Sequence, residues 1–188
     1  MNELDELRAW LTLLRTPELG PATMRELIRQ HDGSAKAVLA RPLAELSRLQ
    51  RLDGSARQWL KAPDAALLDA DIAWLAQGNH HLLRFDEPDF PPQLDDIDQP
   101  PAALFVVGDP ALLLHPQVAI VGARSATPQG LADSRDFAAQ LSAGGLVVTS
   151  GMADGIDGAA HQAALEAGGR TIAVLGTGVD LVYPRKHV

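Results

Sequence analysis

The sequence contains no cysteine among its 188 residues, which excludes disulfide bonds, cysteine-ligated zinc and thiol nucleophiles. It also lacks an apolar run of the ~18 residues that a membrane-spanning helix needs. Its first residues, 1–6, are acidic and resemble neither a secretory signal nor a transit peptide. We therefore expect a cytoplasmic protein without a membrane partner.

Several motifs of enzymes and nucleotide-binding proteins are also missing. There is no Gly-x-x-x-x-Gly-Lys-Ser/Thr loop, no Gly-x-Ser-x-Gly nucleophile elbow, and no His-Glu-x-x-His spacing among the six histidines. The dinucleotide motif Gly-x-Gly-x-x-Gly begins at Gly176 and Gly178, but Leu181 stands where the third glycine is required. These absences support no nucleophile and no metal site, so we expect no catalytic residue, no metal and no cofactor.

The negative charge is unevenly distributed along the chain. The formal net charge is −8, of which residues 1–114 carry −7 and residues 115–188 carry −1. A negative protein disfavours a polyanionic ligand, but a binding site depends on a few local groups rather than on the total charge. We therefore expect any contact with nucleic acid to lie in residues 115–188.

The N-terminal part has the pattern of a small bundle of short helices. Between residues 1 and 77, apolar residues recur at helical spacing, and proline and glycine interrupt the segments. In the first segment Leu4, Leu7, Leu11 and Leu14 form one apolar stripe. A short strand is expected at 81–85, a proline-rich loop at 86–101 and a buried strand at 103–108.

The C-terminal part alternates apolar strands with helices. Strands are expected at 118–122, 146–151 and 171–176, with helices at 128–143 and 157–167 between them. This order predicts an α/β, Rossmann-like, doubly wound and mostly parallel sheet with right-handed crossovers. Because such sheets have five or six strands, we expect the chain to be a truncated form or fragment.

Three loops follow these strands, at 122–127, 150–157 and 176–180. The carboxyl ends of parallel strands meet at one edge of a sheet, where ligands bind. Backbone amides at helix starts favour anions, and Arg124 adds a planar group that suits phosphate oxygens. We predict a DNA- or phosphate-binding site made of Gly122, Ala123, Arg124, Ser125, Thr127, Ser150, Gly151, Met152, Gly155, Asp157, Gly176 and Gly178.

Each of these residues also has an explanation that needs no ligand. Glycine is common wherever a strand turns into a helix, and Arg124 can form a surface ion pair. Thr127 and Asp157 can each cap the helix that follows. His161 is one helical turn from Asp157, so the two can pair in a structural role, and Tyr183 can be a packing residue.

The segment 118–184 resembles the DprA/Smf family of DNA-processing proteins. The matching runs are Val-Ala-Ile-Val-Gly-Ala-Arg at 118–124, the run from Ser150 to His161, and the run from Thr171 to Pro184. The lead-in at 89–94 is similar as well, and the N-terminal helices resemble the family's SAM-like, helix-hairpin-helix-related domain. The resemblance implies a small all-α SAM-like domain at 1–78, a linker and lead-in strand at 79–117, and an incomplete Rossmann-like DNA-binding domain at 118–188.

The resemblance also implies a function. The family binds single-stranded DNA in natural transformation and recombination, protects incoming DNA and helps to load the RecA recombinase, without established catalytic turnover. Arg124 matches a DNA contact of the family, and the run 150–157 matches its second DNA-facing loop. Members form homodimers and contact RecA through regions that we expect to lie beyond residue 188.

One residue departs from the family pattern, and two other functions stay open. Asp154 stands where members often carry a basic residue, and an acid there repels phosphate. The first alternative is a Rossmann-like binder or hydrolase of a small nucleotide, which would use the same phosphate-binding loops. The second is a structural adaptor whose acidic N-terminal helices dock a basic partner.

Overall fold

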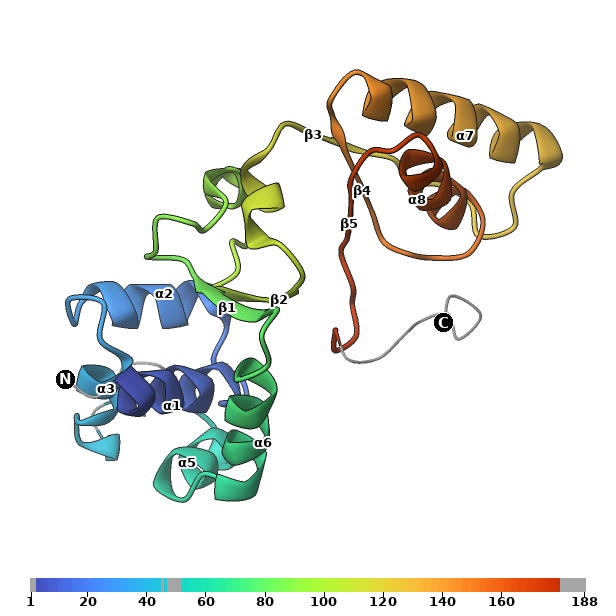
Figure 1. The fold of residues 1–188 in the computed structure, drawn as a ribbon. Helices are drawn as coiled ribbons and strands as arrows, with labels where there is room; N and C mark the ends of the chain where they lie inside the picture. Colours follow the sequence, from blue (N-terminus) through green and yellow to red (C-terminus); the bar gives the residue numbers. More distant parts are fainter. Residues whose placement is uncertain (1–2, 45, 47–51, 180–188) are drawn as a thin grey trace. The chain divides into compact units, whose positions relative to one another are not determined.

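A computed structural model describes residues 3–44, 46 and 52–179, and the chain divides into two compact units after Gly108 (Figure 1). The sequence instead places a linker at 79–117, and those domain boundaries stay a prediction. The first unit contains the helices α1 (Glu3–Leu14), α2 (Pro21–Arg29), α3 (Ala35–Leu39), α5 (Gly54–Lys61) and α6 (Ala65–Leu75), the strands β1 (His80–Arg84) and β2 (Ala103–Val107), and the 3-10 helix η1 (Pro92–Asp96).

The core of the first unit forms where α1, α2 and α3 meet. Trp10, Leu13, Met24, Ile28 and Val38 are all almost fully buried there. The helical bundle predicted from the sequence is therefore present. The predicted stripe on α1 is only partly right, since its C-terminal half faces the core while the first leucine of the stripe is 47% exposed.

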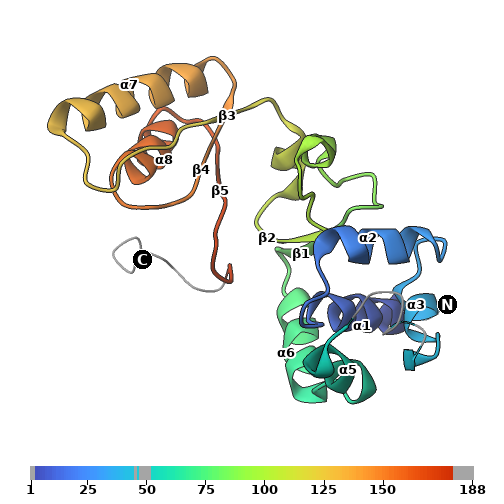
Figure 2. The ribbon, with the colours of Figure 1, turned by 180° about the vertical axis from the view of Figure 1, so that it is seen from behind.

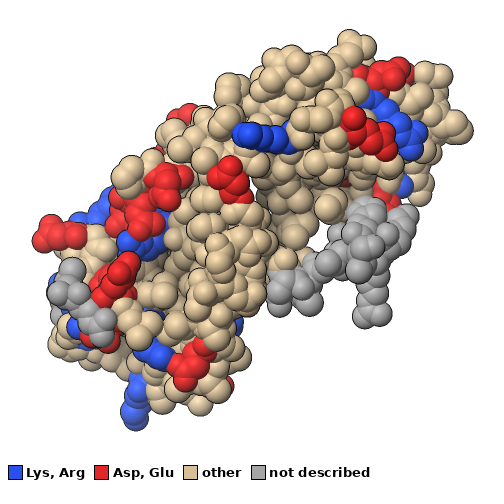
Figure 3. Space-filling model, viewed as in Figure 1, with Lys and Arg blue, Asp and Glu red and all other residues tan. Residues whose placement is uncertain are grey.

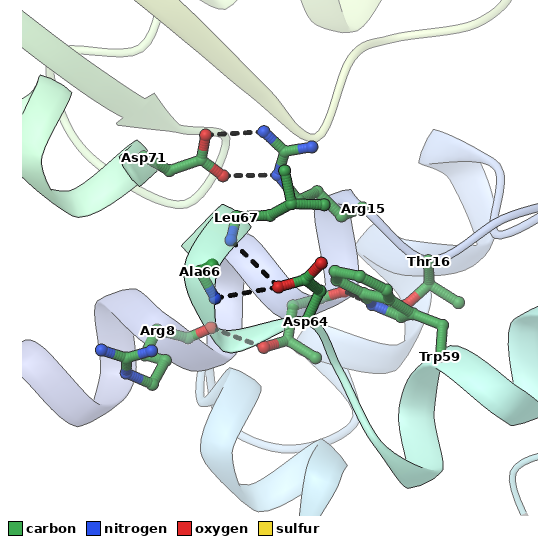
Figure 4. Close-up of polar contacts among 9 residues, drawn as sticks. Arg8, Arg15, Thr16, Trp59, Asp64, Ala66, Leu67 and Asp71 are labelled. Carbon is green, nitrogen blue, oxygen red and sulfur yellow. Dashed lines mark hydrogen bonds and ion pairs between the residues drawn. The ribbon is translucent and has the colours of Figure 1, made fainter. Parts of the chain in front are cut away.

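Polar contacts fasten α5 and α6 to α1 (Figure 4). Arg15 donates two hydrogen bonds to Asp71, with Nε to Oδ2 at 2.5 Å and Nη2 to Oδ1 at 2.7 Å. The indole Nε1 of Trp59 donates to the backbone oxygen of Thr12 at 2.8 Å. Asp64 caps α6 by accepting from the first amides of the helix, which fixes where α6 begins.

A hairpin and a proline-rich loop complete the first unit. β1 and β2 pair antiparallel, which confirms the short strand expected at 81–85. The buried side chain of Arg25 pairs with Asp95, donates to the backbone oxygen of Pro101 at 3.2 Å and lies 4.5 Å from the ring centroid of Phe85. The prediction that β2 is a buried strand is wrong, because Phe105 is 40% exposed: the strand lies in a two-stranded hairpin with only one face packed.

The second unit is a two-layer fragment of the expected sheet fold, with parallel strands in the order β3 (Gln117–Ala119), β4 (Val147–Ser150) and β5 (Thr171–Ala173). A 3-10 helix, η2 (Pro110–Leu114), precedes the sheet. Helix α7 (Pro128–Ala143) connects β3 to β4, and α8 (Ile156–Glu166) connects β4 to β5. Figures 1 and 2 show the two helices side by side next to the strands. The Rossmann-like parallel arrangement predicted from the sequence is confirmed.

Small side chains let these helices approach the sheet closely. Ala138 of α7 and Ala160 and Ala164 of α8 are fully buried against Val148 of β4. Because neighbouring strands follow one another in sequence, both right-handed crossovers place their helices on the same face of the sheet. None of the helices in the described ranges is both long and apolar enough to cross a membrane.

Candidate nucleic-acid interface

The loops that follow β3 and β4 are in direct backbone contact. Gly155 has φ +79°, and a Cβ atom at this position would lie 2.2 Å from the carbonyl oxygen of Ala123 and 2.6 Å from that of Arg124. Ile156 donates its amide hydrogen to the oxygen of Ala123 at 3.2 Å. A Cβ at Gly122 would lie 2.7 Å from the side chain of Ile156. Both glycines are therefore required by the packing of one loop on the other, whatever ligand binds.

Several amides at this edge of the sheet already have partners within the chain. The amide of Gly122 donates to Oδ1 of the buried Asp157 at 3.3 Å, and the amide of Gly158 donates to the oxygen of Ala153 at 3.1 Å. The sequence predicts that Asp157 caps α8. The structure shows instead that Gly155 is the N-cap residue and that Asp157 holds the loop after β3 through the amide of Gly122.

Two of the predicted hydroxyl groups are also used internally. Ser150 is buried, its Oγ donates to the oxygen of Ile120 at 2.5 Å, and its backbone oxygen accepts from the amide of Val174 at 2.8 Å. Oγ1 of Thr127 accepts from the amide of Gly130 at 3.1 Å and so caps α7. These two side chains stabilise the loops on which a binding site would be built.

A cavity of about 540 Å³ opens beside these loops. Its walls come from the loop after β3, the first half of α7, the loop after β4 and the first half of α8. Four residues of the predicted site line it: Arg124, Ser125, Met152 and Gly155. The other eight do not: Gly122, Ala123, Thr127, Ser150, Gly151, Asp157, Gly176 and Gly178.

The cavity also contains residues that the sequence pattern did not single out. Arg135 and Leu131 are four residues apart on α7 and face the cavity together, and Gln162 contributes from α8. The sequence did hold one signal for Arg135. It is one of only three Lys or Arg residues between 109 and 179, the others being Arg124 and Arg170.

The charges of the cavity are mixed. Arg124 and Arg135 are exposed, and within the described part of the chain neither side chain forms a hydrogen bond or ion pair. Asp154 lines the same cavity. Figure 3 shows basic and acidic side chains next to one another on the visible face of the unit that holds α7 and α8. Two guanidinium groups are therefore open to an anion in a region that is not uniformly positive.

His161 also lines the cavity and is only 4% exposed. Its Nδ1 is 2.5 Å from Oγ1 of Thr171, and this hydroxyl donates its only hydrogen to the oxygen of Val148 at 2.6 Å. Nδ1 must therefore carry the hydrogen and donate it to Thr171. The histidine thus ties α8 to β4 and β5. The sequence offered such a structural role as one alternative, with Asp157 as the partner. At Nδ1 the partner is Thr171 instead.

The remaining candidates lie at the edge of the described region or outside it. Gly176 and Gly178 are exposed after β5. Asp180 and Tyr183, which the sequence placed in or near the third loop, lie outside the described residues. Within residues 3–44, 46 and 52–179 there is no group of three or more His, Cys, Asp or Glu side chains that could hold a metal ion.

Two family models match the chain. The model for a DprA-like N-terminal HHH domain matches residues 4–65, and the model for DNA recombination-mediator protein A matches residues 81–188. Protein Smf of Escherichia coli (strain K12) is 42% identical over 132 residues, which cover 70% of this chain and 35% of that protein. Protein Smf of Synechocystis sp. (strain ATCC 27184 / PCC 6803 / Kazusa) is 33% identical over 194 residues, covering 97% of this chain and 47% of that protein.

A solved structure is similar over nearly the whole chain. The X-ray structure of DNA processing protein A (DprA) from Streptococcus pneumoniae superposes with a TM-score of 0.78 at 28% sequence identity, covering 96% of this chain and 61% of that chain. This likeness extends over both compact units. The chain spans about a third to a half of the length of the curated relatives that it matches.

Proposed function

Because the chain belongs to the DprA/Smf family of DNA recombination-mediator proteins, we propose that it binds single-stranded DNA through a backbone phosphate at the Arg124 cavity. The observation that carries the proposal is the exposure of the Arg124 side chain. Its guanidinium is exposed at a cavity, and no described residue holds it in an ion pair. A guanidinium in this state can offer a phosphate two parallel hydrogen bonds.

The backbone that carries Arg124 is held in place before any ligand arrives. The carbonyl groups of Ala123 and Arg124 rest on Gly155, and Ile156 donates to Ala123. A site that is already ordered loses less conformational entropy when it binds. Ser125, next to Arg124 at the cavity, adds a hydroxyl that can donate to a phosphate oxygen.

The binding is expected to depend on side chains more than on backbone amides. Since the amides of Gly122 and Gly158 have partners in the chain, the proposed phosphate contacts come mainly from Arg124 and Arg135. Each such contact should steepen the dependence of log K on log salt by roughly 0.7 for a single strand. We therefore propose weak, salt-sensitive binding with little dependence on aromatic stacking.

The wider role follows from the family. We propose that the chain acts in DNA processing during natural transformation and recombination, protects incoming single strands and takes part in loading RecA recombinase, as a homodimer. We also propose that it binds DNA without catalytic turnover. The support for this is local: His161, the histidine at the cavity, is buried and holds Thr171 in a structural contact.

The direct test is a titration of labelled oligo-dT followed by fluorescence anisotropy at several salt concentrations. Arg124→Glu should weaken binding about tenfold or more, because it removes a charge-assisted pair and adds repulsion. The matched control is Arg170→Glu, which makes the same change of charge in the same unit but away from the cavity. Arg170→Glu should change the affinity about twofold or less, since only long-range electrostatics are altered.

Three results would overturn the proposal. If the Arg124 and Arg170 variants lose the same affinity, the cavity is not the binding site. If the wild-type chain binds no oligonucleotide at low salt while a mononucleotide raises its melting temperature, the function is recognition of a small nucleotide instead. A pull-down that depends on the acidic N-terminal helices, without any DNA binding, would favour the adaptor.

A further inference from the structure

The cavity beside Arg124 contains one side chain whose charge can change near neutral pH. His161 lines the cavity together with Arg124 and Arg135, and it is almost fully buried. Histidine is the side chain that ordinarily gains or loses its charge between about pH 5 and pH 8. The protonation state of this imidazole therefore affects how strongly the cavity attracts an anion.

The hydrogen bonds of the ring determine where a second proton can bind. Nδ1 is 2.5 Å from Oγ1 of Thr171, and that hydroxyl donates to the oxygen of Val148 at 2.6 Å, so the hydrogen of the neutral ring is on Nδ1. The ring can then accept a further proton only at Nε2. Because Nδ1 donates in both charge states, the imidazole can become positive without losing the bond that ties α8 to β5.

The charged groups near the ring lie on several elements. Asp157 precedes His161 by one turn on α8 and is itself buried. Asp154 lines the cavity from the loop after β4, Arg135 from α7, and Arg124 from the loop after β3. The strands β4 and β5 contain no charged residue. The two carboxylates favour a protonated ring and the two guanidinium groups oppose it, so an anion that binds in the cavity shifts this balance toward protonation.

We propose that His161 takes up a proton at Nε2 when single-stranded DNA binds, and that the added charge strengthens the hold on the phosphate at Arg124 and Arg135. The charge acts through space, because water screens charges poorly in a partly buried site. Binding and protonation favour each other, so the affinity rises as the pH falls. This inference rests on the proposed binding of single-stranded DNA and adds a regulation of that site by pH.

The test measures the affinity of the full chain for oligo-dT by fluorescence anisotropy, at constant ionic strength, between about pH 8 and pH 6. Thymine does not change its charge in this range, so a change of affinity comes from the protein. The wild-type chain should bind about threefold or more tightly at the lower pH. His161→Asn should lose most of this gain and bind like the wild type at the higher pH, because asparagine can still donate to Thr171 but does not titrate.

The matched control is His115→Asn, which removes an exposed histidine of the same unit that does not line the cavity. It should keep the gain of the wild type, although it also lowers the positive charge that the chain acquires at the lower pH. The inference is overturned if both variants lose the gain equally, or if the wild type binds no more tightly at the lower pH. A loss of affinity in His161→Asn by the same factor at both pH values would show a purely structural role and overturns it as well. Absence of binding at every pH overturns the proposed function itself.

A measurement on the wild-type chain keeps the inference testable if the His161 variant does not fold. The carbon–hydrogen signals of the His161 imidazole are followed by nuclear magnetic resonance over the same pH range, with and without saturating oligo-dT. The midpoint of the titration should move to higher pH when the oligonucleotide is bound. If the midpoint stays where it is, DNA binding is not linked to this proton and the inference is wrong.

Discussion

Replacing Gly155 by alanine tests whether the loop after β3 and the loop after β4 depend on packing against each other. The residue has φ +79°, and an added Cβ would lie 2.2 Å from the oxygen of Ala123. The backbone conformation alone costs an alanine about 1–2 kcal/mol. The carbonyl oxygen is part of the backbone and cannot rotate away, so the loops after β3 and β4 must also move apart. This movement should lower the stability by about 2–3 kcal/mol more. We expect Gly155→Ala to destabilise the second unit by about 3–5 kcal/mol.

A second glycine with positive φ gives a reference value for the conformational cost of the substitution. Gly168 has φ +75°, and a Cβ there would meet no atom within 4 Å. Gly168→Ala should therefore show only the conformational cost of about 1–2 kcal/mol. Gly155 also has ψ −122°, a conformation that strongly favours glycine, so the difference between the two variants measures the contact between the loops together with this added conformational cost.

The assay must report on the second unit specifically. All three tryptophans, Trp10, Trp59 and Trp74, lie in the first unit, so tryptophan fluorescence follows that unit alone. Urea unfolding is therefore followed by far-ultraviolet circular dichroism, which reports on both units, and by tryptophan fluorescence, which identifies the transition of the first unit and should not move. If Gly155→Ala lowers the free energy of unfolding of the second unit no more than Gly168→Ala does, the two loops do not pack on one another. In that case their packing does not hold Arg124 in position.

Three further predictions concern other sites. Arg135→Ala should weaken binding of oligo-dT and reduce the salt slope by roughly 0.7, whereas Arg170→Ala should leave the slope unchanged in the same anisotropy titration. Asp95→Asn should destabilise the first unit by about 2 kcal/mol in urea unfolding followed by tryptophan fluorescence, because the buried Arg25 loses its carboxylate partner, and no shift would contradict this. Partial burial raises the pKa of Asp86 above its ordinary value of 3.8, so ionisation weakens the folded state as the pH rises through this range. Asp86→Asn should therefore raise the melting temperature at pH 7, and the gain should vanish below about pH 4, where the carboxyl is protonated in both states.

The alternation of strands and helices in the second unit could be predicted because it depends on local patterns. Apolar runs bounded by glycine indicate strands, and Thr127-Pro128 indicates the start of a helix, which the structure places there. The partners of individual side chains could not be predicted in this way. Asp157 has the residue type and position of a helix cap, but it bonds to Gly122, 35 residues earlier, and no local pattern contains that contact.

The same limit applies to the candidate site. Glycines in a loop after a strand suit either a ligand or another backbone segment, and only the folded chain shows that Gly155 faces Ala123 and Arg124. The position of Arg124 beside the cavity could be predicted, because a guanidinium directly after a parallel strand lies at the edge where ligands bind. Arg135 could not be placed, since its position depends on which face of α7 turns toward the loop after β4.

Nuclear magnetic resonance of arginine side chains can show whether a phosphate of the DNA backbone contacts the Arg124 guanidinium, as we propose. The Nε–Hε signals of Arg124, Arg135 and Arg170 are assigned by single substitutions and followed while oligo-dC is added to the full chain. We expect the signals of Arg124 and Arg135, the two arginines that line the cavity, to shift in a saturable way while that of Arg170 stays in place. If the oligonucleotide binds but the Arg124 signal does not move, the DNA contacts another surface and the claim is wrong.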